Sequence, residues 1–331
     1  MTGHIWFCFL LFLTGYCDCS LTGTISSFPI NLENNPYCRI CPNHTMCRFP
    51  LDTDGIRCIN LQHADLDDKD IETILHWHNT YRNTVASGKE IRGNPGPQRP
   101  AKFMMEVMWD DELALIARRW VVQCNLLEKD QCRDVGRFGV WQNVHIFEID
   151  NMGNLSSIAR IRFHIQSWYD EVEDFDSAEF GLVNFVAKSN LPYIPFALST
   201  ISRIGCGRAI YTQRSRFKVK NMATSSTEHT IAIAYGEVRV EALVCNYGPL
   251  DWNTPRELYE DGVPAVCPAG TMRSTQYRAL CQKFQGWHTQ KQRKVQEKRG
   301  KKNNGTTSNK FLKSTVYLIQ LVLLFLIRLL T

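Results

Sequence analysis

The sequence predicts an α+β fold in which helices pack on an antiparallel sheet. Three segments with helical spacing of apolar residues lie between residues 67 and 172, and strand-like segments follow between residues 203 and 247. A run of helices followed by a run of strands is typical of this class. The 331 residues are 44% hydrophobic and 11% aromatic, which is enough for a packed core and excludes global disorder.

The first helix is predicted over Asp67–Val85, because acidic residues at its start suit a helix N-terminus and inward residues follow with helical spacing. The next segment, Arg92–Pro100, contains three Pro and two Gly. No regular helix or central strand tolerates that composition, so we expect an exposed loop. The residues with helical spacing in the first helix are Ile71, Ile74, Leu75 and His78.

The second and third helices are predicted over Asp110–Cys124 and Leu155–Val172. The second has the clearest helical pattern in the chain, with three acidic residues in its first turn and a cysteine at its end. The inward residues are expected to be Leu113, Ile116, Ala117, Trp120, Val121 and Cys124 in the second helix, and Ile158, Ile161, Ile165 and Trp168 in the third.

The strands of the predicted sheet follow the third helix. They cover Arg203–Thr212, Ile231–Val238 and Glu241–Tyr247. Upstream of the first helix, Cys38–Cys58 holds four cysteines in 21 residues with little periodicity. That region is predicted to be a small loop held together by disulfides.

The N-terminus has the pattern of a secretory signal peptide, which we place at residues 1–19. Ile5–Leu13 is almost wholly apolar but too short to span a bilayer as a helix. Cleavage after Cys17 or after Cys19 fits, and the second leaves ten cysteines, an even number that indicates a disulfide framework in an exported chain. The candidate glycosylation sites are the sequons at Asn43, Asn154 and Asn304.

The C-terminus ends in a hydrophobic tail over residues 314–331, behind a basic linker over residues 288–313 that is predicted to be disordered. Small residues around Asn304, a polar spacer and an apolar tail form the pattern of a GPI-attachment signal, with Asn304 as the attachment residue. A short transmembrane anchor is the alternative, at the low edge of the spanning length. A secreted form without an anchor is the third reading.

The net positive charge of the chain is concentrated at its C-terminal end. From Thr289 to Thr331 there are ten basic residues and one acidic residue, whereas the preceding residues hold 28 basic and 32 acidic ones. A slightly acidic body lacks the concentrated basic face that neutralises phosphates, so nucleic-acid binding is disfavoured.

The motifs in the body resemble the insect venom allergen 5 branch of the CAP superfamily, which also includes cysteine-rich secretory proteins and plant pathogenesis-related proteins of class 1. The resemblance covers roughly Cys38 to Cys281, and its run of motifs in order is far more specific than one short pattern. The motifs are HNTYR at 78–82, RGNPGPQRPAKFM at 92–104, MWDDELA at 108–114, CRDV at 132–135, QNV at 142–144, WYDEV at 168–172, IGCG at 204–207 and VCNYGP at 244–249.

The resemblance implies a three-layer α-β-α sandwich over residues 63–250, preceded by a disulfide-rich region over residues 20–62. The short extension over residues 251–287 looks like that of fly members of the branch. The resemblance also implies the disulfides Cys38–Cys47, Cys41–Cys132, Cys58–Cys124, Cys206–Cys245 and Cys267–Cys281, which leave no free thiol for a cysteine nucleophile.

Many CAP proteins have a cleft with two His and two acidic residues that binds a divalent metal in some members. Matched onto this sequence, the four positions hold Glu128, Gln142, Glu171 and Pro192, so Glu171 alone survives. One carboxylate cannot hold zinc with useful affinity. We therefore expect neither a metal nor a cofactor, and no catalytic residue, with Glu171 a helix-surface or cleft-lining residue.

The histidines do not replace the missing ligands. His76 and His78 are two positions apart on the first predicted helix, so their side chains point to different faces. We expect His78 to be a structural histidine that is hydrogen-bonded close to its own helix.

These features predict a non-enzymatic extracellular protein, secreted or attached to the outer face of the plasma membrane, with a monomeric ectodomain. It would bind a protein or lipid ligand. The alternatives are a lipid or sterol carrier, and a CAP-type metal-dependent hydrolase, which the missing cleft residues disfavour. A role in reproduction or defence follows only by analogy with relatives of the branch.

Overall fold

The computed structural model describes residues 35–49, 53–124, 128–180, 182–183, 191–220, 231–252 and 256–283. The described elements lie in one compact unit that begins at Pro36. The helices are α1 (Pro36–Ile40), α2 (Thr45–Arg48), α3 (Asp68–Ala86), α4 (Asp111–Val121), α5 (Ser157–Asp170) and α6 (Ile194–Ala197). The strands are β1 (Ile59–His63), β2 (Ala101–Lys102), β3 (Met108–Trp109), β4 (Gly139–Glu148), β5 (Leu182–Val183), β6 (Arg203–Lys220), β7 (Ile231–Leu250), β8 (Arg256–Glu257), β9 (Glu260–Asp261), β10 (Thr271–Arg273) and β11 (Cys281–Lys283).

A central sheet organises the domain. Its strand order is β1-β6-β7-β4, and β3 pairs in parallel with the start of β6. The two long strands β6 and β7 are antiparallel from the pair Arg203–Gly248 to the pair Lys220–Ile231. Three of the four pairings are antiparallel, so the predicted sheet type is confirmed.

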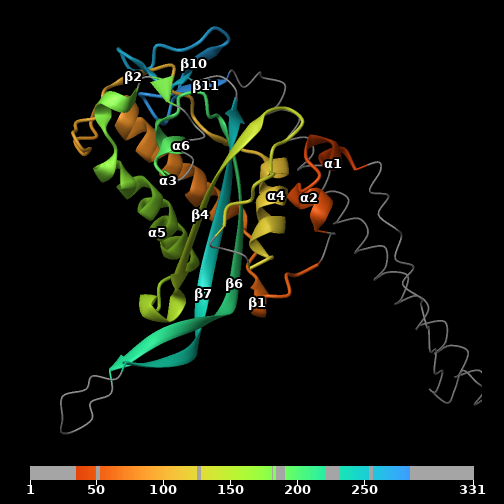
Figure 1. Cartoon of the computed structure of the whole chain (residues 1–331). Coiled ribbons are helices and arrows are strands. Elements are labelled where there is room, and N and C mark those ends of the chain that lie inside the picture. Colours follow the sequence, from red (N-terminus) through yellow and green to blue (C-terminus); the bar gives the residue numbers. More distant parts are fainter. Residues whose placement is uncertain are drawn as a thin grey trace, which may run out of the picture. The chain divides into compact units, whose positions relative to one another are not determined.

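Helices cover both faces of this sheet. Figure 1 shows α3 and α5 on one side of β4, β7 and β6, and α4 on the other side with α1 and α2 beside it. The arrangement is the three-layer α-β-α sandwich that the resemblance implies. In this arrangement helices cover β4 on both faces. The residues of β4 therefore do not alternate between polar and apolar, and the sequence did not predict this strand.

The three predicted helices are present, with small shifts at their ends. α3 begins after Asp67, whose side chain forms a capping box with Asp70. His78 on α3 is fully buried, with Nδ1 2.7 Å from the carbonyl oxygen of Ile74 and Nε2 2.9 Å from the hydroxyl of Tyr247. The prediction of a structural histidine is therefore confirmed.

Other predictions differ from the structure. The order of helices before strands is wrong for β4, which lies between α4 and α5. The two strands predicted within Ile231–Tyr247 form the single strand β7, because β6 continues to pair with it through Arg239 and Val240. Ile158 is exposed rather than inward, since it lies in the first turn of α5, where the neighbouring Ser157 makes polar contacts.

The N-terminal cysteine region contains two short helices, α1 and α2, rather than only loop. Among the described residues no helix is long and apolar enough to cross a membrane. The signal peptide at 1–19, the linker at 288–313, the tail at 314–331 and Asn304 lie outside the described residues.

Helix α4 lies very close to the backbone of β6. A Cβ atom on Gly205 would stand 2.2 Å from the backbone nitrogen of Ala114, and one on Gly207 would stand 2.4 Å from the Cα of Arg118. Both contacts are with backbone atoms, which cannot rotate away. Glycine is therefore required at both positions for the helix to pack on the sheet.

We expect Gly207→Ala to lower the free energy of unfolding by about 3 kcal/mol, because the added methyl group must push α4 away from β6. Gly136→Ala is the matched control, since a Cβ there has no atom within 4 Å. Urea denaturation of both purified variants measures the difference. Equal midpoints would contradict the packing argument.

Candidate functional site

The four positions of the family cleft differ in their surroundings. Glu128 and Glu171 are exposed, Pro192 is half-buried, and Gln142 is fully buried on β4. Glu171 directly follows the last residue of α5 and caps that helix. Burial raises the pKa of its carboxyl group, and the nearby charge of Lys129 opposes that shift.

The Gln142 side chain is bound on both sides within the core. Its amide nitrogen donates to Oδ1 of Asn246 at 2.9 Å, and its carbonyl oxygen accepts from the backbone N–H of Asp130 at 2.8 Å. Asn246 in turn donates to the carbonyl oxygen of Leu113 at 3.2 Å. Gln142 thus joins β4, β7, α4 and the segment around Asp130, and this is a structural role.

Pro192 has no side-chain donor atom, and its carbonyl oxygen accepts a hydrogen bond from Asn143 at 2.8 Å. Among the described residues, no three His, Cys, Asp or Glu side chains are placed to hold a metal ion. Zinc sites in proteins use three or four such ligands. The residues at this cleft therefore do not fit a divalent metal.

A lysine supplies a positive charge near Glu171. Nζ of Lys129 lies 5.4 Å from the ring centre of Trp141, a cation–π contact. Burial, followed by the charge of Arg133, lowers the pKa of Lys129 to about 8, and Glu171 partly offsets this. The chain thus places its own cation next to the one surviving family carboxylate.

Two tryptophans lie next to these charged groups, and of the two Trp141 is buried in the core. Trp141 and Trp252, the tryptophan pair, stack with ring centres 6.2 Å apart, and the Arg133 guanidinium lies 5.7 Å from the Trp252 ring. Trp252 is half-buried and donates its indole N–H to Oδ1 of Asp134 at 3.2 Å. Lys129 and Arg133 therefore each stack on one member of the pair.

An open depression of about 450 Å³ adjoins the pair at Trp252. That volume lies within the range of small-ligand sites in proteins. Apolar, aromatic and charged groups line it together, which suits recognition of an amphipathic group. The lining residues include Asp134, Arg137, Phe138, Pro249, Leu250 and Trp252.

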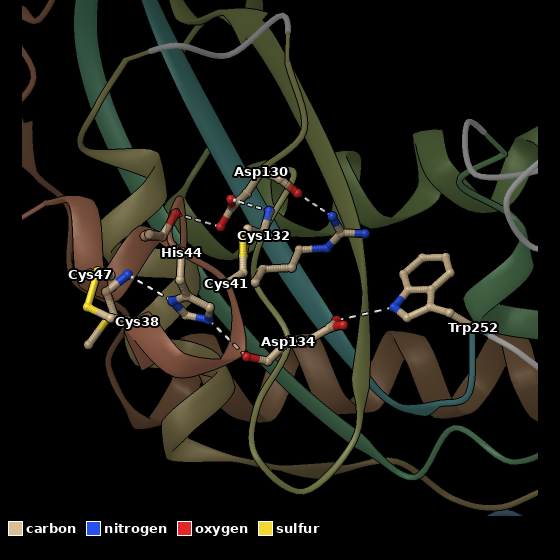
Figure 2. The surroundings of a disulfide bond; sticks show 11 residues. Cys38, Cys41, His44, Cys47, Asp130, Cys132, Asp134 and Trp252 are labelled. Carbon is tan, nitrogen blue, oxygen red and sulfur yellow. Dashed lines mark hydrogen bonds between the residues drawn. A yellow bond between two sulfur atoms is a disulfide. The ribbon is translucent and has the colours of Figure 1, made fainter. Parts of the chain in front are cut away.

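The segment from Asp130 to Asp134 is linked to the N-terminal region, and Figure 2 shows Cys132 of this segment bonded to Cys41. The Cys41–Cys132 disulfide joins the two segments, and Thr45 donates to Oδ2 of Asp130 at 2.6 Å. His44 is fully buried, with Nε2 2.8 Å from the carbonyl oxygen of Asp134. The disulfide-rich region therefore holds in place residues 130–134, of which Arg133 and Asp134 contact Trp252.

The family model for CAP, the cysteine-rich secretory protein family, matches residues 75–247. The chain belongs to this family. The venom allergen 3 homolog of Dinoponera quadriceps is 34% identical over 254 residues, which is 72% of this chain and 92% of the relative. The venom allergen 5 of Dolichovespula arenaria is 34% identical over 231 residues, 68% of this chain and 99% of the relative.

These matches confirm the resemblance to the venom allergen 5 branch. Among solved structures, "Structure of BmVAL-1" covers 66% of this chain and 96% of that one, at 19% identity and a TM-score of 0.48. The structure contains the disulfides Cys38–Cys47, Cys41–Cys132, Cys58–Cys124, Cys206–Cys245 and Cys267–Cys281, the pairs that the resemblance implies. Disulfides and a secretory family indicate an extracellular protein.

A polar cluster that the sequence did not predict lies between α5 and the sheet. Nδ1 of His145 on β4 lies 2.8 Å from Nδ1 of His164 on α5. His164 also faces Glu241 on β7 at 3.6 Å, and Arg160 pairs with Glu241 at 2.6 Å. The two histidines are 19 positions apart in different elements, so no local motif predicts their contact.

Proposed function

We propose that the chain is an extracellular, non-enzymatic binding protein built on the CAP scaffold. The proposal rests on the residues at two family positions. The Gln142 side chain is buried with both its amide nitrogen and its carbonyl oxygen hydrogen-bonded, and Pro192 has no side-chain donor atom. Neither can take part in acid–base or metal chemistry.

The exposed part of Trp252 and the adjoining depression supply a recognition surface in place of a catalytic centre, and the buried Trp141 supports Trp252 from the core. Aromatic side chains with adjacent cations are frequent anchors in binding sites. The proposed ligand is a protein or a lipid. Attachment to a membrane through residues 314–331, by a GPI anchor at Asn304 or by a spanning tail, and a role in reproduction or defence, belong to this proposal as predictions.

Zinc titration tests the non-enzymatic part. Calorimetry of the purified chain with ZnCl₂ is expected to show no stoichiometric binding, because Gln142 stands at an acidic position without a carboxylate and Pro192 stands at a histidine position without an imidazole. Glu171→Gln should give the same titration curve. Zinc binding at one ion per chain that Glu171→Gln abolishes would overturn the proposal in favour of a metal-dependent hydrolase.

Lipid analysis of the secreted protein separates a protein-binding role from the carrier alternative. Solvent extraction followed by mass spectrometry is expected to yield lipid well below one molecule per chain, because the depression at Trp252 is open rather than enclosed. Stoichiometric sterol or fatty acid would show that the domain is a carrier.

A further inference from the structure

The sequon at Asn43 lies in the N-terminal region that two disulfides hold in place. Asn43 is exposed in the turn before α2, but the next two residues, His44 and Thr45, are 0% exposed. The Cys38–Cys47 disulfide encloses the whole sequon. The acceptor side chain is therefore on the surface while the rest of the motif is inside.

The contacts that bury Thr45 come from a distant segment. Its hydroxyl donates to Asp130 at 2.6 Å, and its backbone N–H donates to the carbonyl oxygen of Cys132 at 3.2 Å. Figure 2 shows Asp130 close to the Cys41–Cys132 disulfide. The partners lie 85 or more positions further along the chain, so this closure needs tertiary folding.

The sequon at Asn154 differs in this respect. Asn154, Leu155 and Ser156 are all exposed, and the Ser156 hydroxyl accepts only from the backbone N–H of Ala159, at 3.3 Å. The other contacts of the motif are with Arg160 of the same helix turn. This sequon is thus held by local structure alone, and its hydroxyl stays on the surface.

N-glycosylation needs both ends of the motif. The asparagine amide nitrogen forms a bond to C1 of the sugar and loses one proton, while the bond from C1 to the pyrophosphate of a lipid-linked oligosaccharide breaks. The transferase also contacts the hydroxyl at the third position. The transferase cannot reach a Thr45 hydroxyl that is buried against Asp130, even though the Asn43 side chain is exposed.

We propose that Asn43 is an N-glycosylation site that folding closes, whereas Asn154 stays open. Because Asp130 is synthesised 85 residues after Thr45, at about 5–20 residues per second the motif is open for at least about 4 s during synthesis. Chains modified in that period carry a glycan on the exposed turn. Chains that fold first remain unmodified at Asn43. This proposal requires export but is independent of the ligand.

The test compares occupancy at the two sites in one molecule. The full chain and the Cys41→Ser/Cys132→Ser double variant are expressed in secreting insect cells, and peptide mass spectrometry after enzymatic deglycosylation in ¹⁸O water gives occupancy. Removal of the long-range disulfide delays docking of residues 130–134 and leaves no unpaired cysteine among the described residues. Asn43 occupancy is expected to rise about twofold or more, with Asn154 unchanged.

Asp130→Ala is the second variant, because it removes the acceptor of the Thr45 hydroxyl and leaves every disulfide in place. It should also raise Asn43 occupancy. Occupancy is read from intracellular as well as secreted chains, so a variant that is retained in the cell still reports. Equal Asn43 occupancy in all three proteins, at any level, or a parallel rise at Asn154, would overturn the proposal.

Discussion

Arg82→Leu is expected to prevent the domain from accumulating in its folded form. The guanidinium is fully buried and donates to the backbone carbonyl oxygens of Met105, Pro195, Leu198 and Ile201 at 2.7–3.0 Å. Burial lowers the pKa of Arg82 to about 9, so the group remains charged at neutral pH. Each carbonyl left unpaired costs about 1–3 kcal/mol, and the total approaches the whole stability of a domain, about 5–15 kcal/mol.

Arg82→Lys should also destabilise the domain strongly, because an ammonium group has three donors and cannot reproduce the planar fork that reaches four carbonyls. Arg239→Ala is the control, since Arg239 pairs with Asp150 on the surface and both side chains are more than half exposed. Yield of secreted protein and urea midpoints are the readouts. An Arg82→Leu protein with a near-normal midpoint would show that the carbonyls find other donors.

Arg82 also shows what the sequence could and could not predict. The HNTYR motif, together with the other motifs, pointed to the family and hence to the layers of the fold. The role of Arg82 as a donor to several backbone carbonyls was not predictable, because the acceptors lie 23 to 119 positions away. Periodicity gives the buried face of a helix but not the backbone groups that a buried charge will meet.

The sequence also predicted only part of the candidate site. The absence of the family ligands at Gln142 and Pro192 was predictable from the motifs, because Gln142 lies in the QNV motif and Pro192 is reached by counting back from the IGCG motif. Lys129 and Trp252 were not predicted as partners of the cleft, since a cation–π contact leaves no mark on local sequence. β4 was missed for a further reason: its two buried faces remove the alternation that identifies a strand.

A second large effect is expected from pH. Among the described residues, His44, His78 and His164 are buried and His145 is half-buried beside His164, and burial is the main cause that lowers the pKa of each. The pKa of His78 and that of His145 fall to about 3. For His145 the positive charge of His164 adds to the effect of burial, and His164 itself lies near Arg160 and Arg208 as well as Glu241.

The direction of the effect follows from proton linkage. Below pH 6.5 these histidines bind protons in the unfolded chain, while in the folded chain they stay neutral until the pH approaches their lowered pKa. Stability is therefore fully present above pH 6.5 and is lost as the pH falls towards 3. Between pH 7 and pH 5, each histidine with a pKa near 3 removes about 2 kcal/mol, so the domain should lose several kcal/mol.

His145→Asn tests this explanation through the slope of the unfolding free energy against pH, and not through stability at one pH alone. The variant should reduce the fall in unfolding free energy between pH 7 and pH 5 by about 1 kcal/mol per pH unit, because one buried titrating group is gone. The loss of the contact with His164 lowers stability at every pH and leaves the slope readable. His63→Asn is the control, because that side chain is 47% exposed. Urea denaturation at four pH values gives both slopes, and identical slopes for His145→Asn and the unaltered chain would rule out His145 as a source of acid sensitivity.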